Sequence, residues 1–292
     1  MKWKSQFYSV RLVVLAALLF AGILYPSGPA QGWDVFASSP WLAMVTRFIG
    51  GVYVSVKPVQ EWNSDGETVR RIRQKDIPKG AKIIALDEAE ASALGLRKNS
   101  YKNLFLLYNK VPFDRERADF FFSDPSVLPF IAQRVLTALS QFDSPNYAYF
   151  QRRLSEFQTR LDSTVLVGRQ LLGGYPVFDL TGGFNSLLSA AGCEILPRDR
   201  GRREQWEKGE DMAGLVSQAG EAIKSMIPVV LDGSTAKAIR NTLKGNKNIL
   251  FLSRPNPNQD LLLFFHDQFL LLWNRLALLR EKQAAASSTK KK

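Results

Sequence analysis

Four acidic side chains lie on loops that lead into predicted helices, and carboxylates so placed could bind a cation. They are Asp65, Glu67, Asp119 and Asp232. Carboxylate oxygens are common ligands of divalent metals. The same placement also has an ordinary structural cause, because an acid near a helix N-terminus stabilises the helix dipole. A non-standard oxygen-rich metal site, built from Asp65, Glu67 and Asp232, is therefore one of three hypotheses for the function.

Arginines and a glycine pair offer the opposite chemistry, the binding of an anion. Arg115, Arg117 and Arg254 carry guanidinium groups, which pair well with carboxylate or phosphate. The segment 181–183, Thr-Gly-Gly, precedes a predicted helix and would present backbone amides to an anion. Most arginines are simply solvated, however, and two glycines also make an ordinary turn between a strand and a helix. An anion site is a hypothesis that needs convergent geometry.

Three consecutive phenylalanines could line an apolar ligand cleft. Phe120, Phe121 and Phe122 precede Ser123 in a strongly apolar stretch. The ordinary interpretation is a buried strand that leads into the next helix, where at least one ring must face the core. We expect both: two rings in the core, and Phe120 toward the cleft.

The chain has a single histidine, His266, in an apolar C-terminal segment. Histidine is a common metal ligand, but one alone cannot form a paired-histidine motif, and we expect a half-buried packing residue. The sequence also shows no glycine-rich phosphate loop and no serine in a nucleophile elbow. These observations predict a binding protein, not an enzyme, with no catalytic residues and no cofactor.

One long helix would position the candidate residues. Apolar side chains recur at steps of three and four between Phe150 and Val165, which places them on one helical face. Ser144 is expected to cap this helix, and Pro145 fits its first position. If the helix extends to about Leu172, at about 1.5 Å per residue it is roughly 40 Å long. We interpret it as a strut between two lobes.

Strands and helices alternate on both sides of this helix. Before it, strands are predicted at 34–39, 52–56, 81–86 and 103–108, with helices at 40–49, 68–75 and 87–96. After it, strands are predicted at 175–180, 193–196, 228–231 and 248–252, with helices at 183–191, 212–226, 234–243 and 260–280. This order predicts two α/β lobes of mainly parallel sheet flanked by helices, with a ligand cleft between them at the carboxyl ends of the strands. The expected domains are a leader at 1–30, lobes at 31–143 and 173–283, the linking helix at 144–172, and a disordered basic tail at 284–292.

The first thirty residues have the layout of a secretory signal peptide. Lys2, Lys4 and Arg11 precede the apolar run 12–25, and small residues follow up to Ala30, after which we expect cleavage. The run is shorter than the about 20 residues that span a bilayer, although an uncleaved anchor is the alternative. The single cysteine, Cys193, cannot form an internal disulfide, so the apolar core must stabilise the fold.

The net charge of +12 suggests anionic lipid surfaces, acidic partners or an anionic ligand. Nucleic acid is not expected, because an exported chain without a recognition motif is a poor candidate. The cluster Arg198, Arg200, Arg202 and Arg203 is predicted to be a solvated surface loop. The alternative is a contact with a membrane permease or with acidic lipids.

Several motifs occur in an order that points to a known family. They are 37–43 (ASSPWLA), 47–51 (RFIGG), Asp124-Pro125, Asn146-Tyr147, and Phe184 with Leu187, Ala190 and Gly192. Their order and spacing resemble the zinc/manganese solute-binding proteins of ABC transporters, the TroA-like family, over residues 34 to about 278. The resemblance implies that family's fold, in which one long backbone helix joins two α/β lobes.

The resemblance also implies a metal site, whose ligands this sequence does not carry. The family holds its metal with two histidines from the first lobe, then a histidine or glutamate, then an aspartate or glutamate from the second. These positions correspond to the loop 61–67, Phe120, Thr181 and about Ser253. At least three of the four donors are absent, so we expect the family fold without the family metal site.

The function implied by the resemblance is an exported, periplasmic solute-binding protein that serves an ABC permease in the inner membrane. Its unidentified ligand would be a chelated metal, a small organic anion or an apolar-faced molecule. The expected cleft residues are Asp65, Glu67, Phe120, Thr181, Gly182, Asp232, Ser253 and Arg254. The alternative is a ligandless periplasmic interaction protein that kept the scaffold.

Overall fold

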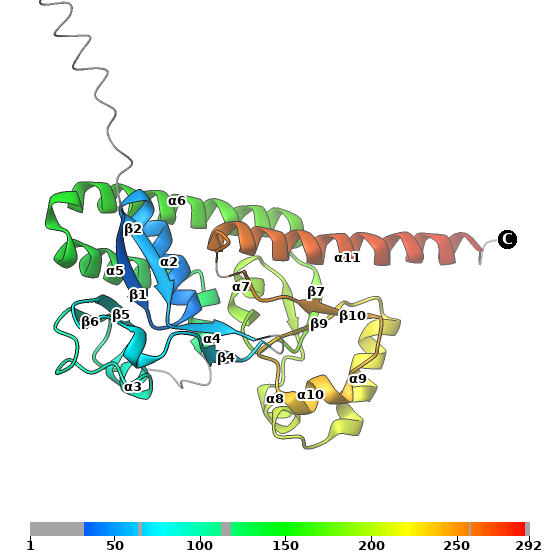
Figure 1. Ribbon diagram of the computed structural model, residues 1–292. Coiled ribbons are helices and arrows are strands. Elements are labelled where there is room, and N and C mark those ends of the chain that lie inside the picture. The colour runs from blue at the N-terminus through cyan, green and yellow to red at the C-terminus, as the bar shows by residue number, and fades with distance from the viewer. Residues whose placement is uncertain (1–31, 64–65, 112–117, 257, 290–292) are drawn as a thin grey trace, which may run out of the picture.

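Two four-stranded parallel sheets and one long helix make up the architecture (Figure 1). The computed structural model describes residues 32–63, 66–111, 118–256 and 258–289. The predicted signal peptide, Asp65, Arg115 and Arg117 lie outside these ranges. The fold class predicted from the sequence, two parallel sheets flanked by helices with one long helix between them in the chain, is confirmed.

The first sheet has the strand order β2-β1-β5-β6, with all neighbours parallel. Its strands are β1 (Trp33–Ala37), β2 (Val54–Pro58), β5 (Lys82–Ala85) and β6 (Leu104–Leu106). Helices α2 (Pro40–Gly50) and α3 (Glu88–Ala93) follow β1 and β5. From β1 the chain passes to β2 on one side of it and then returns to β5 on the other side. The loops that follow β1 and β5 therefore diverge at the carboxyl edge of the sheet. Open α/β sheets bind ligands at such a switch point.

Helix α2 carries Trp41 and has well-defined ends. Ser39 Oγ accepts a hydrogen bond from the Leu42 amide at 3.3 Å, and Pro40 occupies the first turn. Gly51, at φ +52°, ends the helix in a conformation that favours glycine. Every residue of α2 except Arg47 is buried, so the packing fixes Trp41 at the carboxyl edge of β1.

A β-hairpin replaces the helix predicted at 68–75, so that prediction is wrong. Strands β3 (Gln60–Trp62) and β4 (Thr68–Arg70) pair antiparallel with Trp62 opposite Thr68, and a short 3-10 helix, η2 (Gln74–Asp76), follows. Thr68 and Val69 are β-branched and fit a strand, and pairing with β3 satisfies backbone groups that a short isolated helix would expose.

Two helices in series follow the first lobe. Helix α5 (Leu128–Phe142) and helix α6 (Tyr147–Leu172) are separated by η4 (Ser144–Asn146). The predicted apolar face of α6 is confirmed, because its residues from Phe150 to Leu161 on that face are buried. Within the described residues, no side-chain hydrogen bond caps η4 or α6, so the predicted Ser144 cap is wrong.

The second sheet repeats the topology of the first, with the order β10-β9-β7-β8 and parallel neighbours. Its strands are β7 (Pro176–Asp179), β8 (Glu194–Leu196), β9 (Val229–Asp232) and β10 (Ile249–Leu252). The connecting helices are α7 (Asn185–Ala190), α8 (Arg200–Glu207), α9 (Met212–Lys224) and α10 (Lys237–Thr242). Each lobe therefore presents the carboxyl ends of its first and third strands at a switch point.

Helix α8 occupies the segment predicted as a charged loop, so that prediction is wrong. Asp199 accepts hydrogen bonds from the amides of Gly201 and Arg202 and caps the helix. Arg203 leaves the surface, because its side chain pairs with the buried Asp179 at 3.5 Å and with Glu207 at 3.1 Å. Only part of the arginine cluster is therefore solvated.

Two further elements differ from the prediction. Phe120, expected in a strand, lies in the short helix α4 (Ala118–Ser123). Helix α11 (Leu261–Thr289) extends into the segment predicted as a disordered tail. It lies beside α6 and projects beyond the second sheet (Figure 1). Among the described residues, no helix is both long and apolar enough to cross a membrane.

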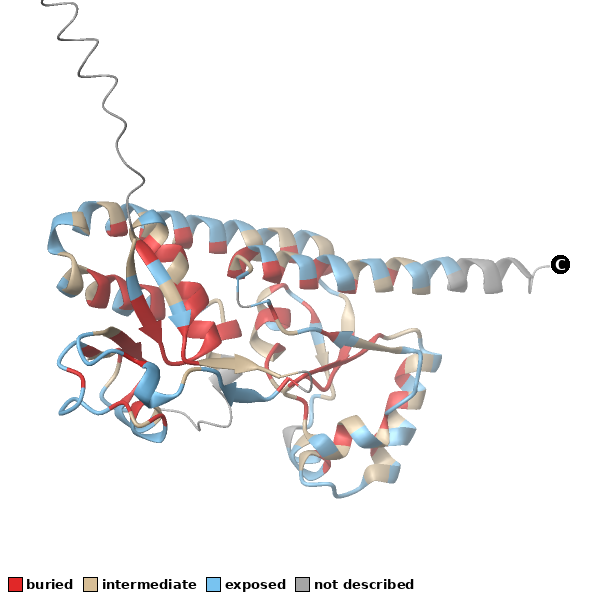
Figure 2. Ribbon diagram, in the orientation of Figure 1, coloured by how far each residue is buried: buried red, intermediate tan, exposed pale blue. Residues whose placement is uncertain are grey.

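The largest core cluster is shared by both lobes. It includes Val35 of the first sheet, Val177 and Val230 of the second, Phe157 on α6 and Phe265 on α11. Figure 2 shows this buried layer between the sheets and the two long helices. Buried Cys193 belongs to it, and burial raises the pKa of its thiol to about 12. A shared core limits how far the lobes can separate.

Candidate functional site

Aromatic side chains form the first-lobe wall where the two switch points face each other. The Trp41 ring lies 5.1 Å from Trp62 of the hairpin and 6.3 Å from Phe122 of α4, measured between centroids. It also contacts Phe264 of α11, at 6.2 Å. Trp41, Phe122 and Phe264 are each at most 4% exposed. This wall is a packed aromatic cluster, with its polar groups limited to indole N–H donors.

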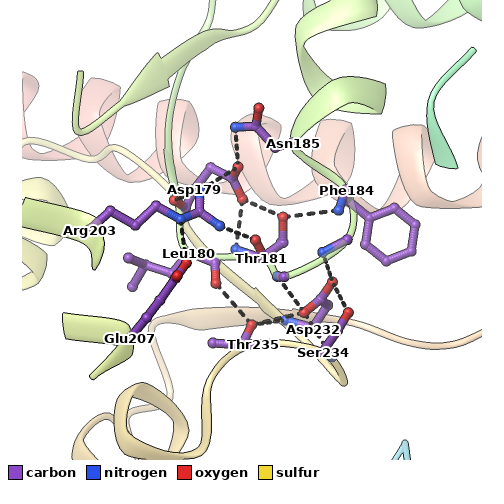
Figure 3. A network of polar contacts seen from close by, with 12 residues as sticks. Asp179, Leu180, Thr181, Phe184, Asn185, Arg203, Glu207, Asp232, Ser234 and Thr235 are labelled. Carbon is purple, nitrogen blue, oxygen red and sulfur yellow. Dashed lines mark hydrogen bonds and ion pairs between the residues drawn. The ribbon is translucent and has the colours of Figure 1, made fainter. Parts of the chain in front are cut away.

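The second-lobe wall is polar, and Asp232 at the end of β9 is its centre (Figure 3). Its Oδ1 accepts from the Gly182 amide at 2.9 Å, the Ser234 amide at 3.0 Å and Thr235 Oγ1 at 2.9 Å. Its Oδ2 accepts from the Gly183 amide at 2.9 Å and from Ser234 Oγ at 3.1 Å. A carboxylate has about four lone-pair sites, so five internal donors leave none directed at a ligand.

Burial and hydrogen bonding act in opposite directions on Asp232. Burial raises the pKa of its carboxyl group, whereas the hydrogen bonds from Gly182, Thr235 and Ser234 and the nearby Arg254 charge lower it. Burial is the larger effect, and the pKa lies above its usual value. The predicted anion nest at Gly182 and Gly183 does exist, but the chain's own carboxylate fills it.

Thr181 is likewise engaged inside the second lobe. Its hydroxyl donates to Asp179 Oδ1 at 2.6 Å and accepts from the Phe184 amide at 3.2 Å. Asp179 in turn accepts from Asn185 Nδ2 at 2.8 Å and pairs with Arg203 (Figure 3). This arrangement fixes the turn after β7 and directs the Thr181 hydroxyl away from a ligand.

The two walls touch each other. Ser123 Oγ of α4 donates to the Gly183 carbonyl in a buried hydrogen bond. Gly66, at φ +79°, lies against Gly233, and a Cβ on Gly66 would approach Gly233 Cα to 3.1 Å. The cavity between the walls measures about 10 Å³. That is room for about one water molecule, too little for an organic ligand.

A larger hollow opens at the mouth of this closed cleft. It measures about 320 Å³ and is lined by Asn63, Gly66, Gly233, Arg240, Phe251, Ser253 and Arg254. A second hollow of about 560 Å³ shares Arg240 and Phe251 with it. The second hollow adds Lys237, Lys244 and Glu67 to the lining. Phe251 is 51% exposed and lies in both, so the mouth combines positive charge with one open aromatic face.

The structure divides the eight predicted cleft residues into three groups. Glu67, Ser253 and Arg254 line the hollows at the mouth. Thr181, Gly182 and Asp232 lie in the buried second-lobe wall. Asp65 lies outside the described residues, and Phe120 lies in α4 with a side chain that is not described. The six described residues are therefore divided between the mouth and the wall behind it, and Arg254 borders both the hollow and the small cavity beside Asp232.

Four residues of the candidate site were missed from the sequence. Trp41 stood inside a quoted motif, and its place beside a strand end could have identified it. Arg240, Phe251 and Trp62 carried no signal, because only the packing of α10 beside β10 and the position of the hairpin bring them to the mouth.

The described residues near the positions that the resemblance assigns to the metal have their side-chain oxygens in internal hydrogen bonds or offer only a hydroxyl group. Thr181 and Asp232 spend their oxygens on internal hydrogen bonds, and Ser253 offers only a hydroxyl. Within the described ranges, no group of three or more His, Cys, Asp or Glu side chains could hold a metal ion. His266 is half-buried on α11, as predicted for a packing residue.

Known proteins resemble this chain in structure but not detectably in sequence. No protein-family model matches it, and no curated protein matches it. ZnuA superposes with a TM-score of 0.61 at 14% identity, over 83% of this chain and 98% of that one. The laminin-binding protein Lmb of Streptococcus agalactiae, described as a bifunctional protein with adhesin and metal-transporting activity, gives 0.59 at 15% over 84% and 100%.

A third solved structure gives the same result. The manganese-bound periplasmic metal-binding protein of Candidatus Liberibacter asiaticus superposes with a TM-score of 0.55 at 13% identity, over 83% of this chain and 99% of that one. Matches of this kind extend over nearly the whole length of each known protein. The chain therefore has the fold of the TroA-like zinc/manganese solute-binding proteins, which the order of its sequence motifs also resembles.

Proposed function

We propose that this chain is an exported solute-binding protein of an ABC import system that binds a small organic anion, or an anionic metal chelate, at the mouth of its interlobe cleft. The observation that supports this is the hollow of about 320 Å³ between the hairpin loop and the ends of β9 and β10, lined by Arg240 and Arg254. The protein would work in the periplasm and deliver its ligand to a permease in the inner membrane. The fold it shares with ZnuA and the manganese-binding protein supports that setting.

The mouth suits the ligand better than the floor of the cleft does. The floor holds about 10 Å³ between packed aromatic rings and a saturated carboxylate. At the mouth, by contrast, exposed Ser253 and half-exposed Phe251 border the hollow. A ligand there would touch the hairpin of the first lobe and the strand ends of the second, so its binding would couple to the angle between the lobes.

Arginine chemistry favours an anion at this place. A guanidinium group has five N–H donors in a planar fork, so it can share an added carboxylate while it keeps existing contacts. The Arg254 guanidinium also lies 5.6 Å from the centroid of the Trp62 ring, a contact that holds the cation beside the hairpin. The indole Nε1 of Trp62 is buried and has no hydrogen-bond partner among the described residues.

The test pairs elemental analysis of the exported protein with calorimetric titration. Titrants are citrate, an aromatic carboxylate such as benzoate, ferric citrate, and free zinc and manganese ions. We expect an anion or chelate to bind and free metal ions not to bind. Arg254→Gln and Arg240→Gln should weaken binding about tenfold each, because one charge-assisted contact is lost. The control Arg198→Gln, on an exposed side chain, should leave the affinity unchanged.

One stoichiometric metal ion per chain, removed together with stability, would contradict the proposal and support the carboxylate-site alternative built from Asp65, Glu67 and Asp232. Equal affinities for wild type and both arginine variants would place the ligand elsewhere.

The second candidate is a ligandless periplasmic interaction protein that kept the scaffold. The closed floor supports it, because Ser123, Gly183, Gly66 and Gly233 join the walls without a ligand. This function predicts no thermal shift with any titrant, together with co-purification of a membrane or periplasmic partner. A measurable shift with a single anion would exclude it.

A further inference from the structure

Five exposed basic side chains gather at one end of the first lobe, away from the cleft. They are Lys75, Lys79, Arg97, Lys98 and Lys102, called here the basic edge. They come from two loops, 74–81 before β5 and 97–103 before β6. Neither loop contributes a residue to the hollows at the cleft mouth. The proposed ligand site therefore does not account for this charge.

Hydrogen bonds join the two loops into one platform. Tyr101 Oη donates to the Gln74 carbonyl at 3.0 Å, and Asn103 Nδ2 donates to the Gly80 carbonyl at 3.1 Å. Ile77, Leu96 and Tyr101 are buried together in the second core cluster of this lobe. The five charges thus project from a packed surface and keep their positions relative to each other.

The five cations are not neutralised within the fold. No salt bridge involves any of them in the part of the chain that the structure describes. The neighbouring acid Asp76 is already paired with Arg73 at 3.0 Å, and Glu61 with Arg71 at 3.6 Å. The basic edge therefore carries a local excess of positive charge, which attracts anionic surfaces over a distance.

The strand register places the basic edge at the opposite end of the sheet from the cleft. Val35 pairs with Lys82, and Ile83 pairs with Leu104, so the amino ends of β1, β5 and β6 share one edge. Lys82 Nζ lies 3.5 Å from the centroid of Trp33, the first residue of β1. The chain thus enters the first lobe at the same edge that carries the charge. A membrane bound there would leave the cleft mouth facing away from it.

The composition of the basic edge fits a lipid surface better than a specific protein partner. Protein interfaces have an apolar core with aromatic anchors. Between residues 70 and 103, all of which are described, no large hydrophobic side chain is strongly exposed. Four of the five cations are lysines, which act as flexible point charges, and attraction of basic clusters to anionic lipids needs only such charges near the surface.

We propose that the basic edge binds the anionic lipid headgroups of the membrane surface and holds the protein there with its cleft directed away from the bilayer. Binding is electrostatic and reversible, so it weakens as salt screens the charges beyond about 10 Å at 0.1 M. This contact is independent of whether the cleft mouth binds an anion.

Co-sedimentation of the full chain with lipid vesicles tests this contact. Vesicles of phosphatidylcholine alone are compared with vesicles that contain about one third phosphatidylglycerol, at salt from about 50 to about 300 mM. We expect salt-sensitive binding to the anionic vesicles only. The variant K75E/K79E/K98E/K102E should reduce the salt-sensitive part of the binding about tenfold or more.

The matched control K110E/K208E/K224E/K247E makes the same change of net charge on exposed lysines outside the basic edge. It should stay within about twofold of wild type, because distant charges are screened. Equal losses in both variants would overturn the proposal in favour of a net-charge effect. The neutral variant K75Q/K79Q/K98Q/K102Q, with unchanged melting temperature, excludes misfolding as the cause.

Two other results would also overturn it. One is the absence of salt-sensitive binding by wild type. The other is a variant K75E/K79E/K98E/K102E that binds vesicles as well as wild type but binds soluble polyglutamate, at equal charge density, about tenfold more weakly. That result would assign the edge to an acidic protein. Binding of anions at the cleft mouth should be unchanged in the edge variant, so the two proposals fail separately.

Discussion

The two walls of the cleft have the same topology and opposite chemistry. The first-lobe wall is a cluster of aromatic rings around Trp41, whereas the second-lobe wall is a hydrogen-bonded network around Asp232. Both walls lie at a switch point of a four-stranded parallel sheet with an equivalent strand order. The fold therefore dictates where a site can be, and the side chains decide whether one is present.

The comparison also shows two ways to close a site. On the first lobe, packing removes the space, since Trp41 and Phe122 are buried against each other. On the second lobe, internal donors occupy the acceptor sites. The amides of Gly182, Gly183 and Ser234 donate to the Asp232 carboxylate, which would otherwise be available to a ligand. Only the mouth keeps both open space and side chains that face the hollow, so it is the place where we propose binding.

Removal of the central ring should have the largest effect. Trp41→Ala should lower the free energy of unfolding by about 4 kcal/mol, because a large buried aromatic is replaced by a cavity between the lobes. Urea denaturation measures the change, and Trp41→Phe should cost less than half as much. If Trp41→Ala cost less than 1 kcal/mol, the first wall would not be a packed core, and the cleft would be open in solution.

Removal of the central carboxylate should have the next largest effect. Asp232→Ala leaves three amides and two hydroxyls without their carboxylate acceptor, and we expect a loss of about 3 kcal/mol in the free energy of unfolding. Asp199→Ala is the matched control, because Asp199 caps α8 at an exposed position with an ordinary backbone conformation, where loss of a cap costs about 1 kcal/mol. Similar losses in the two variants, by chemical denaturation, would show that Asp232 is not the centre of a cooperative network.

A smaller effect isolates the contact between the walls. Gly66 and Gly174 have almost the same φ, +79° and +78°, but only Gly66 faces another backbone segment. Alanine at either position adopts a left-handed conformation with a similar strain. The difference in unfolding free energy between Gly66→Ala and Gly174→Ala therefore measures the close approach to Gly233. We expect Gly66→Ala to be the less stable by about 1 kcal/mol in thermal denaturation. Equal stability would mean that the hairpin is not seated on the second lobe.

The order of strands and helices along the chain was predictable because it depends on local residue patterns. The apolar face of α6 follows from residue spacing alone, and Ser39-Pro40 with Gly51 fixes both ends of α2. The hairpin was missed because β4 is stabilised by pairing with β3, which precedes it by a short loop, and not by the spacing of its own residues. Helix α8 was missed because it is stabilised by the Arg203–Asp179 pair, whose aspartate belongs to a separate strand.

The candidate site was predictable only in part, for the same reason. Ser253 and Arg254 follow a strand end, so their place at the mouth follows from the α/β pattern. Asp232 also follows a strand end, yet its carboxylate turns inward to Gly182, some fifty residues earlier in the chain. Position along a strand predicts which residues reach the cleft, but the direction of each side chain depends on partners that the sequence does not place.

The close pair of indoles at the cleft wall has an optical consequence. The ring centroids of Trp41 and Trp62 lie 5.1 Å apart with their planes at 76°, a separation at which the strong far-ultraviolet transitions of the two indoles couple and give a paired band in circular dichroism. Trp62 belongs to the hairpin that borders the mouth, whereas Trp41 belongs to the fixed helix α2. Any occupant that shifts the hairpin changes this band, so the unmodified protein carries its own spectroscopic probe for a search among ligands.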